Sequence, residues 1–410
     1  MSVKIKQAAI LCGGLGSRLG ALTAETPKPL LPVNGTPFLQ LLIQEVSRYG
    51  IERFLLLASY RSEQIEQFAL EVPRALGRNI HIDVAIEPHR AGTGGALFHA
   101  RDQLDDAFYL LNGDTLLDTP LQTLANLLDT PQALGALALR PLQSAGRYGV
   151  TVLDGDTVTQ FGVRPVADGP VLINGGVGAF RKEIIDRLEP SGSLENDLLT
   201  PLALEGRLRG VAVDGFFLDI GIPSDFQRAQ SEIPAFRRRP ALFLDRDGVI
   251  NIDHGHVGTI DRFEWVEGAP EAISLANALG FYVFIVTNQA GIGKGLYSLE
   301  EYHVLSRHIR DAATSLGARI DDERYCPDHP DAVLEAYRRK SSWRKPEPGM
   351  LRDLIEKWPL DLGASFLIGD RETDIVAAHA AGIDGYRFQH GRLDDFLKDI
   401  LNERGLGGLR

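Results

Sequence analysis

The 410-residue chain has little cysteine, no excess of basic residues and no long apolar run. Its two cysteines, Cys12 and Cys326, lie far apart in the sequence, so we expect no disulfide framework and a reducing, cytoplasmic setting. The formal net charge of -12 argues against nucleic acid or an anionic membrane as the main partner. The first apolar run, residues 8–12, is too short for a signal peptide or a membrane span and predicts a buried strand.

Alternating strand and helix patterns occur twice, over residues 1–233 and again over 241–400. This alternation predicts two α/β domains with largely parallel sheets, although two strand-like runs around Asp-Gly-Asp at 154–156 predict a hairpin. Residues 234–240 are predicted to form a linker with three solvated arginines, and phosphate binding by these arginines is the alternative. The polar tail, residues 401–410, is assigned no role.

A glycine-rich loop follows the first predicted strand. Gly13, Gly14 and Gly16 allow the backbone to approach a ligand closely and to aim its N–H groups at phosphates. The loop has neither the Walker sequence nor a complete Rossmann fingerprint, so alone it is weak evidence. Two cations follow it, Arg18 and Lys28, and phosphoryl chemistry needs positive charge where negative charge accumulates in the transition state.

Two aspartates in the same half are predicted to follow strands. Asp114 ends the stretch "FYLLNGD" and Asp219 ends "GFFLD". The carboxyl ends of strands line the ligand-binding crevice of an α/β sheet, so these carboxylates are placed to hold Mg²⁺ there. Each aspartate alone is equally compatible with a helix cap or a turn.

These pieces occur in the order found in the sugar-1-phosphate nucleotidyltransferases, which residues 1 to about 230 resemble. The matching stretches are "GGLGSRL…KPLLPV", "EPHRAGTGGAL", "LNGDTLL", "INGGVGAF", "SLENDLL" and "FFLDIGIPSDF". The resemblance implies a Rossmann-like domain with a mixed sheet, in which a sugar 1-phosphate attacks the α-phosphorus of a nucleoside triphosphate and pyrophosphate leaves. By position it places Arg18 and Lys28 on the triphosphate, Asp114 and Asp219 on Mg²⁺, Gly13, Gly14, Gly16 and Gly94 on the nucleotide, and Asn174, Gly175 and Glu195 on the sugar.

The chain departs from this family at one place. Many members have Glu-Lys-Pro where this chain has Val163, Arg164 and Pro165. Arg164 can replace the lysine as a contact to the sugar phosphate, because its planar fork binds phosphate through two hydrogen bonds. Val163 removes a carboxylate near the sugar, which leaves the identity of the sugar more open than the reaction.

A pair of carboxylates opens the second half. Asp245 and Asp247 end the strand in "ALFLDRDG", where one can attack phosphorus while the other gives a proton to the leaving oxygen and later takes one from water. Thr287 ends the next apolar strand and suits a phosphate oxygen. Lys345 is placed to steady a covalent intermediate, and Asp370 ends a third strand as a further ligand for the Mg²⁺ that such chemistry needs.

These four pieces in this order resemble the haloacid-dehalogenase-like (HAD-like) phosphatases over residues 240 to about 395. The segments between the four pieces are too short for a large cap domain. The pieces are most similar to those of the small capless members that remove the 7-phosphate of D-glycero-D-manno-heptose 1,7-bisphosphate. Histidinol-phosphate phosphatases are close relatives of these members. The resemblance implies a capless Rossmannoid sheet. It places Asp245, Asp247 and Asp370 on Mg²⁺ and Asn288 and Arg344 on the sugar phosphate.

Relatives of this second half often hold a structural zinc on a Cys-x-His…Cys-x-Cys loop. Here the four positions carry Cys326, Asp328, Ser341 and Trp343, and His329 is one residue off. One soft ligand cannot form a tetrahedral zinc site, so no zinc is predicted. The loop is expected either to be ordered by Trp343 and a helix over 331–340 or to be mobile.

The two resemblances together imply a bifunctional cytoplasmic enzyme with Mg²⁺ in both domains. It would remove the 7-phosphate of D-glycero-α-D-manno-heptose 1,7-bisphosphate and then transfer GMP from GTP to the heptose 1-phosphate, which forms GDP-heptose for surface polysaccharides. The expected partners are these small molecules, without nucleic acid or membrane, and a homo-oligomer stays open. Two alternatives remain. In the first, the enzyme carries out the same two reactions on another sugar, such as a mannose-type phosphate, or with another nucleotide. In the second, the first domain is not catalytic but senses a nucleotide sugar and regulates the phosphatase.

Overall fold

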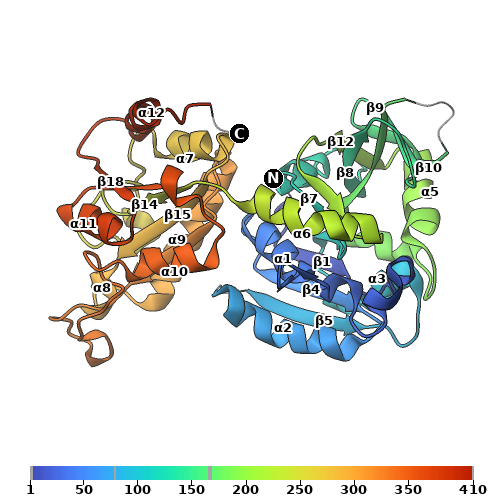
Figure 1. Ribbon diagram of the computed structural model, residues 1–410, viewed down its shortest axis with the longest axis horizontal. Coiled ribbons are helices and arrows are strands. Elements are labelled where there is room, and N and C mark those ends of the chain that lie inside the picture. Colours follow the sequence, from blue (N-terminus) through green and yellow to red (C-terminus); the bar gives the residue numbers. More distant parts are fainter. Residues whose placement is uncertain (1–2, 78–79, 165–168, 409–410) are drawn as a thin grey trace. The chain divides into compact units, whose positions relative to one another are not determined.

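The computed structural model describes residues 3–77, 80–164 and 169–408, and the chain folds into two compact units, Met1–Pro234 and Ala235–Arg410 (Figure 1). Each unit has its own sheet and its own apolar core. No helix in the described ranges is both long enough and apolar enough to cross a membrane.

The N-terminal unit is built on a nine-stranded mixed sheet. Its first four strands in space are parallel, and the long strand β11 then pairs antiparallel on both sides. In spatial order the strands are β5 (His81–Ile86), β4 (Arg53–Ala58), β1 (Gln7–Leu11), β6 (Ala107–Asn112), β11 (Val171–Arg181), β8 (Gly135–Leu142), β12 (Leu208–Ala212), β10 (Thr157–Val163) and β9 (Val150–Asp154). The predicted mixed sheet is confirmed, and β9 and β10 form the predicted hairpin.

Helices and a small second sheet complete this unit. The helices are α1 (Phe38–Ser47), α2 (Ser62–Leu76), α3 (Gly92–His99), α4 (Leu121–Leu127), α5 (Thr200–Leu204), which follows a π-helical turn (Leu194–Leu199), and α6 (Pro223–Arg237). Short strands β2 (Pro32–Val33) and β3 (Thr36–Pro37) pair beside the glycine-rich loop. Strands β7 (Thr115–Leu117) and β13 (Phe217–Asp219) pair antiparallel, with Asp219 opposite Thr115. This pairing brings two distant segments together at one edge of the unit.

The C-terminal unit has a five-stranded, wholly parallel sheet in the order β16, β15, β14, β17 and β18. The strands are β16 (Asp322–Cys326), β15 (Tyr282–Asn288), β14 (Ala241–Leu244), β17 (Phe366–Gly369) and β18 (Asp384–Arg387). The three central strands are apolar runs because both faces of a parallel sheet are covered.

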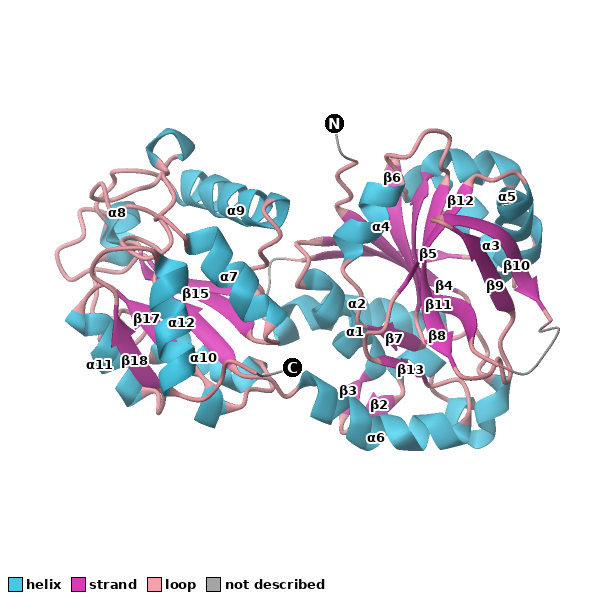
Figure 2. Ribbon diagram, turned by 90° about the horizontal axis from the view of Figure 1, so that it is seen from above, coloured by secondary structure: helices cyan, strands magenta, loops and turns pink. Residues whose placement is uncertain are grey.

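Helices cover both faces of this second sheet (Figure 2). One core contains residues of α7 (Ala269–Ala278), α9 (Leu299–Ser315) and α12 (Leu393–Glu403), and the other contains residues of α10 (Gly349–Lys357) and α11 (Glu372–Ala380). Among described residues, the segments 245–268 and 327–348 contain one short 3₁₀ turn each. Neither segment forms a cap domain, in agreement with the capless fold expected.

Two element boundaries and one predicted helix differ from those expected. Helix α6 continues to Arg237, through the first four residues of the predicted linker, and α12 runs three residues into the predicted tail. The helix predicted over 331–340 is wrong, since only Glu335–Tyr337 forms a 3₁₀ turn. Val333 and Leu334 are 67% and 44% exposed, so the two large aliphatic side chains of this segment are not packed against the unit. A helix of ten residues without such packing is marginal in water.

Candidate active sites

The glycine-rich loop of the N-terminal unit follows β1 directly. A Cβ atom at Gly13 would lie 2.8 Å from Oε1 of Glu87, and Gly16 has a left-handed φ of 62°. At Gly14, by contrast, a Cβ would meet open space. Two of the glycines are therefore required by close approach or backbone conformation, and the third leaves the loop open toward a ligand.

Lys28, Asp114 and Asp219 come together where β7 and β13 pair. Lys28 is only 6% exposed, and its ammonium donates to Oδ2 of Asp114. The carbonyl of Asp114 accepts from the N–H of Ile220 at 2.9 Å. A Cβ at Gly221 would lie 2.6 Å from Oδ1 of Asp219 and 3.2 Å from Nζ of Lys28, so the ammonium lies near both carboxylates. The two aspartates predicted from strand ends thus share one site.

The sequence analysis missed two residues that contact Asp219. Arg147 donates from Nη2 to Oδ2 of Asp219 at 3.0 Å and from Nη1 to Asp225 at 2.7 Å, and the Tyr148 hydroxyl donates to the same Asp219 oxygen at 3.2 Å. Burial, and then the charge of Asp219, raises the pKa of Tyr148 far above its usual value. Both residues lie in the connection between β8 and β9. An arginine followed by a tyrosine in a loop does not by itself indicate a functional site.

A third missed residue is Glu87, directly after β5. Its Oε2 accepts from the N–H of Ala91 at 2.6 Å, just before α3, while Oε1 faces Gly13. Burial raises the pKa of Glu87, and the hydrogen bond from Ala91 opposes that shift. Gly94 is buried in α3, where its N–H donates to the carbonyl of Gly192. The carboxylate therefore lies between the glycine-rich loop and the start of α3, and Arg18 is exposed at the far end of that loop.

The residues predicted to contact the sugar are only partly brought together. Asn174 and Gly175 lie on β11 at an irregularity of its pairing with β8, and a Cβ at Gly175 would lie 2.5 Å from Leu117. Arg164 and Glu195 are exposed, and in the described part of the chain no hydrogen bond joins their side chains to Asn174. Pro165 lies outside the described residues.

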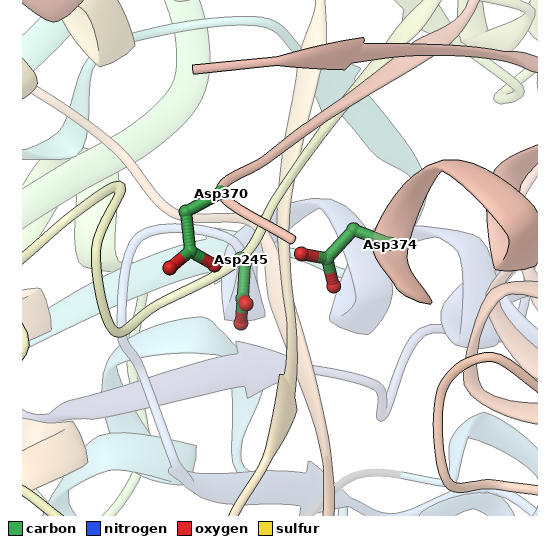
Figure 3. A group of neighbouring side chains, drawn as sticks. All are labelled: Asp245, Asp370 and Asp374. Atoms are coloured by element: carbon green, nitrogen blue, oxygen red, sulfur yellow. The ribbon is translucent and has the colours of Figure 1, made fainter. Parts of the chain in front are cut away.

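In the C-terminal unit, three carboxylates gather at the carboxyl edge of the sheet (Figure 3). Asp245 directly follows β14, Asp370 directly follows the adjacent parallel strand β17, and Asp374 lies in the first turn of α11. One oxygen from each lies within 4.8 Å of the others. Oδ1 of Asp370 is buried and has no hydrogen-bond partner among the described residues. An unsatisfied buried oxygen beside two more carboxylates is a donor set that fits Mg²⁺.

Lys345 is buried within this group. Its Nζ lies 2.9 Å from Oδ1 of Asp245 and 2.6 Å from Oδ1 of Asp374, and it donates to the carbonyl of Val286 at 2.8 Å. Burial raises the pKa of Asp245 to about 7; Lys345 opposes this shift, and Asp374 adds to it. Burial opposes the charge on the lysine, but the two carboxylates raise the pKa of Lys345 overall.

The carboxylate of Asp247 lies outside that group. Its Oδ1 accepts from Asn251 at 3.0 Å and from the buried Arg246 at 2.8 Å, and its Oδ2 accepts from Gln289 at 2.9 Å. A fully buried guanidinium needs a counter-ion, and Asp247 supplies it. The carboxylates that lie within 4.8 Å of one another are therefore those of Asp245, Asp370 and Asp374, and the predicted role of Asp247 at the metal stays a prediction.

A pocket of about 400 Å³ opens in front of this group. Asp245, Thr287 and Lys345 lie on its wall, together with Asn288, whose side-chain amide exchanges two 3.0 Å hydrogen bonds with the backbone of Lys345. The wall also carries five basic residues, of which only Arg344 was predicted: His256, Lys294, His329, Arg344 and Arg371. The others stand singly in loops or beside a short helix, where one basic residue is an ordinary surface feature.

Hydrogen bonds and an ion pair occupy the loop that binds zinc in relatives. Cys326 is buried and hydrogen-bonded to Ser341, and burial raises the pKa of its thiol. Asp328 pairs with Arg339 at 2.9 Å, and its carbonyl accepts from Arg344 at 3.3 Å. Trp343 packs against the core that contains Cys326. Serine and tryptophan are not zinc ligands, so this donor set does not fit a tetrahedral zinc site.

Comparison with known proteins gives a family for each half of the chain. The model of the nucleotidyl transferase family matches residues 7–235, more than half of the chain. The chain belongs to this family. A second model, described as HAD-hydrolase-like, matches residues 342–395.

Curated relatives match the C-terminal half. D-glycero-beta-D-manno-heptose-1,7-bisphosphate 7-phosphatase of Rhodopseudomonas palustris is 49% identical over 166 residues, 40% of this chain and 92% of the relative. D-glycero-alpha-D-manno-heptose-1,7-bisphosphate 7-phosphatase of Burkholderia mallei is 46% identical over 143 residues, 35% of this chain and 76% of the relative. This nucleotidyl transferase therefore also belongs to the HAD-like phosphatase family. Among solved structures, HddC from Yersinia pseudotuberculosis complexed with GMP-PN aligns with a TM-score of 0.49 and 28% identity, covering 56% of this chain and 100% of that one.

Proposed function

We propose that the chain carries out two consecutive steps of nucleotide-activated heptose biosynthesis. The C-terminal unit removes the 7-phosphate of D-glycero-α-D-manno-heptose 1,7-bisphosphate, and the N-terminal unit transfers GMP from GTP to the resulting heptose 1-phosphate. The products are phosphate, pyrophosphate and GDP-heptose. The observation that carries the proposal is the carboxylate group of Asp245, Asp370 and Asp374, with Lys345 among them, at the wall of a pocket rich in basic residues.

In the phosphatase step, Asp245 attacks the phosphorus of the 7-phosphate. Asp247 gives its proton to the leaving sugar oxygen and then takes a proton from the water that hydrolyses the aspartyl phosphate. Lys345 lies against Asp245 and offsets charge that builds up on the phosphoryl group. Asp370 and Asp245 would hold Mg²⁺, which when bound reduces the repulsion between carboxylate and phosphate.

The basic residues of the pocket favour a substrate with a second phosphate. Burial and the neighbouring cations Arg344 and Lys294 lower the pKa of His329, and burial and Lys294 lower the pKa of His256. The repulsion shows that Lys294 places positive charge beside both histidines and Arg344 beside His329, on the side of the pocket where a bound anion would relieve it. We therefore assign the uncleaved 1-phosphate of the bisphosphate to the side of the pocket that carries Arg344 and Lys294.

In the transfer step, the backbone of the glycine-rich loop binds the triphosphate together with Arg18 and Lys28. These donors stabilise charge that develops on the phosphates as pyrophosphate leaves. Asp114 and Asp219 would hold Mg²⁺ together, since this ion is commonly bound by one or two carboxylates and the substrate phosphates. In support, both carboxylates lie near Nζ of Lys28. Asn174, Gly175 and Glu195 contact the sugar, and Arg164 contacts its phosphate.

Glu87 supports guanine as the nucleobase. A carboxylate only accepts hydrogen bonds, and guanine presents two adjacent donors, N1–H and the N2 amino group. Uracil and thymine present one N–H between two carbonyls, which a carboxylate would repel. Oε1 of Glu87 faces the glycine-rich loop where the nucleotide would bind, so the carboxylate is placed to select GTP.

One assay tests the proposal. The full chain is given the α-anomer of heptose 1,7-bisphosphate, Mg²⁺ and, in separate reactions, GTP, ATP, UTP or dTTP, and phosphate and pyrophosphate are followed separately. We expect phosphate in every reaction and pyrophosphate only with GTP. Phosphate without pyrophosphate in any reaction would overturn the transferase assignment, and equal rates with mannose 1-phosphate as the acceptor would overturn the assignment of the sugar.

A further inference from the structure

Gln289 is the first residue after β15 and is only 1% exposed. Both ends of its side-chain amide are fully bonded. Nε2 donates to Oδ2 of Asp247 at 2.9 Å and to Oγ1 of Thr287 at 2.8 Å. Oε1 accepts from the Tyr297 hydroxyl at 2.5 Å and from Nη2 of Arg246 at 3.1 Å. One buried side chain thus connects Asp247, which transfers the proton in the proposed phosphatase step, with Thr287, whose hydroxyl is predicted to contact a phosphate oxygen.

The chemistry of the neighbours fixes which end of the amide faces which residue. A guanidinium only donates, so the oxygen of Gln289 must face Arg246. A carboxylate only accepts, so the amide nitrogen must face Asp247. The alternative orientation would place nitrogen against guanidinium and oxygen against carboxylate. The assignment of the two amide atoms therefore rests on the network itself.

This orientation has a consequence for Thr287. Its hydroxyl oxygen accepts a hydrogen bond from Nε2 of Gln289, so the O–H of Thr287 is left to donate a hydrogen bond to another group. Thr287 lies on the wall of the pocket. The amide therefore keeps the hydroxyl in the donor role that a phosphate oxygen requires.

The same amide also fixes Asp247. The second amide proton and Asn251 hold the two oxygens of that carboxylate, one each, and Arg246 bonds both. A carboxylate that hands a proton to a leaving group must be held in one place within hydrogen-bond reach of it.

We propose that Gln289 is a positioning residue of the phosphatase site, which with one amide group orients the Asp247 carboxylate and the Thr287 hydroxyl. The inference rests on the proposed phosphatase activity but not on the identity of its sugar. As the bond from Asp245 to phosphorus forms and the bond to the leaving oxygen breaks, Asp247 passes its proton to that oxygen. In the second half, water attacks phosphorus, Asp247 takes the proton of the water, and Asp245 is released.

The test compares leaving groups in the full chain. Gln289→Met conserves the volume of the side chain but removes both donated hydrogen bonds. We measure kcat/KM, which reports transfer of the phosphoryl group to Asp245 and not the later hydrolysis that both substrates share. With phenyl phosphate, whose leaving group needs a proton, we expect kcat/KM to fall by about 100-fold or more. With p-nitrophenyl phosphate, whose leaving group departs without a proton, the fall in kcat/KM should be several times smaller. Inhibition by inorganic phosphate should weaken for both substrates, because Thr287 is no longer oriented.

Two further variants keep the test decisive. Tyr297→Phe is the matched control, because it removes one bond to Oε1 and leaves both Nε2 bonds; it should keep kcat within about threefold on both substrates, since Arg246 still holds the amide. Gln289→Glu replaces the donor nitrogen by an acceptor oxygen with little change of shape. If the Met variant does not fold, the two leaving groups are compared in this variant instead, with the same expected result. Fluorescence of the three tryptophans, all of which lie in the C-terminal unit, reports that this unit is folded in each variant.

Equal loss of kcat/KM with both leaving groups, or no loss with either, would overturn the proposal. A parent chain that hydrolyses phenyl phosphate but not heptose bisphosphate would contradict the proposed substrate, while the comparison of leaving groups would still decide the role of Gln289.

Discussion

Nζ of Lys345 lies 2.9 Å from Oδ1 of Asp245, and both side chains are buried. The same ammonium reaches Oδ1 of Asp374 at 2.6 Å. One buried cation thus balances two buried carboxylates, in the group where the phosphatase step is proposed to start. Removal of a single member of such a group leaves charge uncompensated in a medium of low polarity.

Lys345→Met is therefore expected to destabilise the C-terminal unit by about 3–5 kcal/mol. Denaturant unfolding followed by tryptophan fluorescence measures this unit selectively, because all three tryptophans, Trp265, Trp343 and Trp358, lie in it. Adding Asp374→Asn to the same chain should recover part of the loss, since one unpaired carboxylate is then removed. A loss of about 1 kcal/mol or less, as for an exposed ion pair, would contradict this account of the group.

Glu87→Gln should relax the choice of nucleobase. The amide replaces one acceptor by a donor, so kcat/KM with GTP should fall by roughly 10- to 100-fold while ATP and UTP change little. The rate of pyrophosphate release with heptose 1-phosphate gives kcat/KM for each nucleotide, and hence the ratio of kcat/KM with GTP to that with ATP or UTP. Asp83→Asn, an exposed carboxylate on the same strand β5, is the matched control and should leave the ratio unchanged. Parallel losses for all nucleotides would mean that Glu87 does not select the base.

Arg339→Met should weaken binding of the bisphosphate without harming the chemical step. Arg339 pairs with the buried Asp328, whose carbonyl holds Arg344 at the pocket. We expect KM for heptose bisphosphate to rise by about tenfold, on the scale of one lost contact to a charged group, with kcat for p-nitrophenyl phosphate nearly unchanged. Lys340→Met removes the same charge one residue further on and should have no effect. If both variants behave alike, the effect is one of net charge rather than of the loop.

Neither cysteine of the folded chain should react readily with iodoacetamide. Cys12 and Cys326 are buried, and burial raises the pKa of both thiols, so the reactive thiolate is scarce at about pH 8. Mass spectrometry should show no label on the native chain and two labels after unfolding. Rapid labelling of Cys326 alone would show that the loop through Ser341 and Trp343 opens in solution.

The residues that sequence located well are those whose position follows from the backbone. Asp245 and Asp370 were predicted because each ends an apolar strand, and parallel strands bring such ends to one edge. Asp114 and Asp219 were likewise expected at strand ends, and the pairing of β7 with β13 brings them together.

The residues that sequence missed act through the direction of a side chain. Glu87 faces Gly13, Arg147 bonds Asp219 and Gln289 bonds Asp247. No spacing along the chain indicates these contacts between distant segments. The direction of Asp247 depends on the neighbouring Arg246, because a buried guanidinium requires a counter-ion, and the pattern Asp-Arg-Asp alone does not reveal that the arginine is buried.

The central claim is that the C-terminal unit makes the substrate of the N-terminal unit, and a mixing experiment with two inactivated chains tests it most directly. Asp245→Asn removes the proposed nucleophile of the phosphatase, and Asp114→Asn removes a proposed metal ligand of the transferase. Each variant alone, given heptose 1,7-bisphosphate, GTP and Mg²⁺, should form no GDP-heptose, and an equal mixture of the two should form it. If the Asp245→Asn chain alone makes a nucleotide sugar from the bisphosphate, or if the mixture makes none, the proposed order of the two steps is wrong.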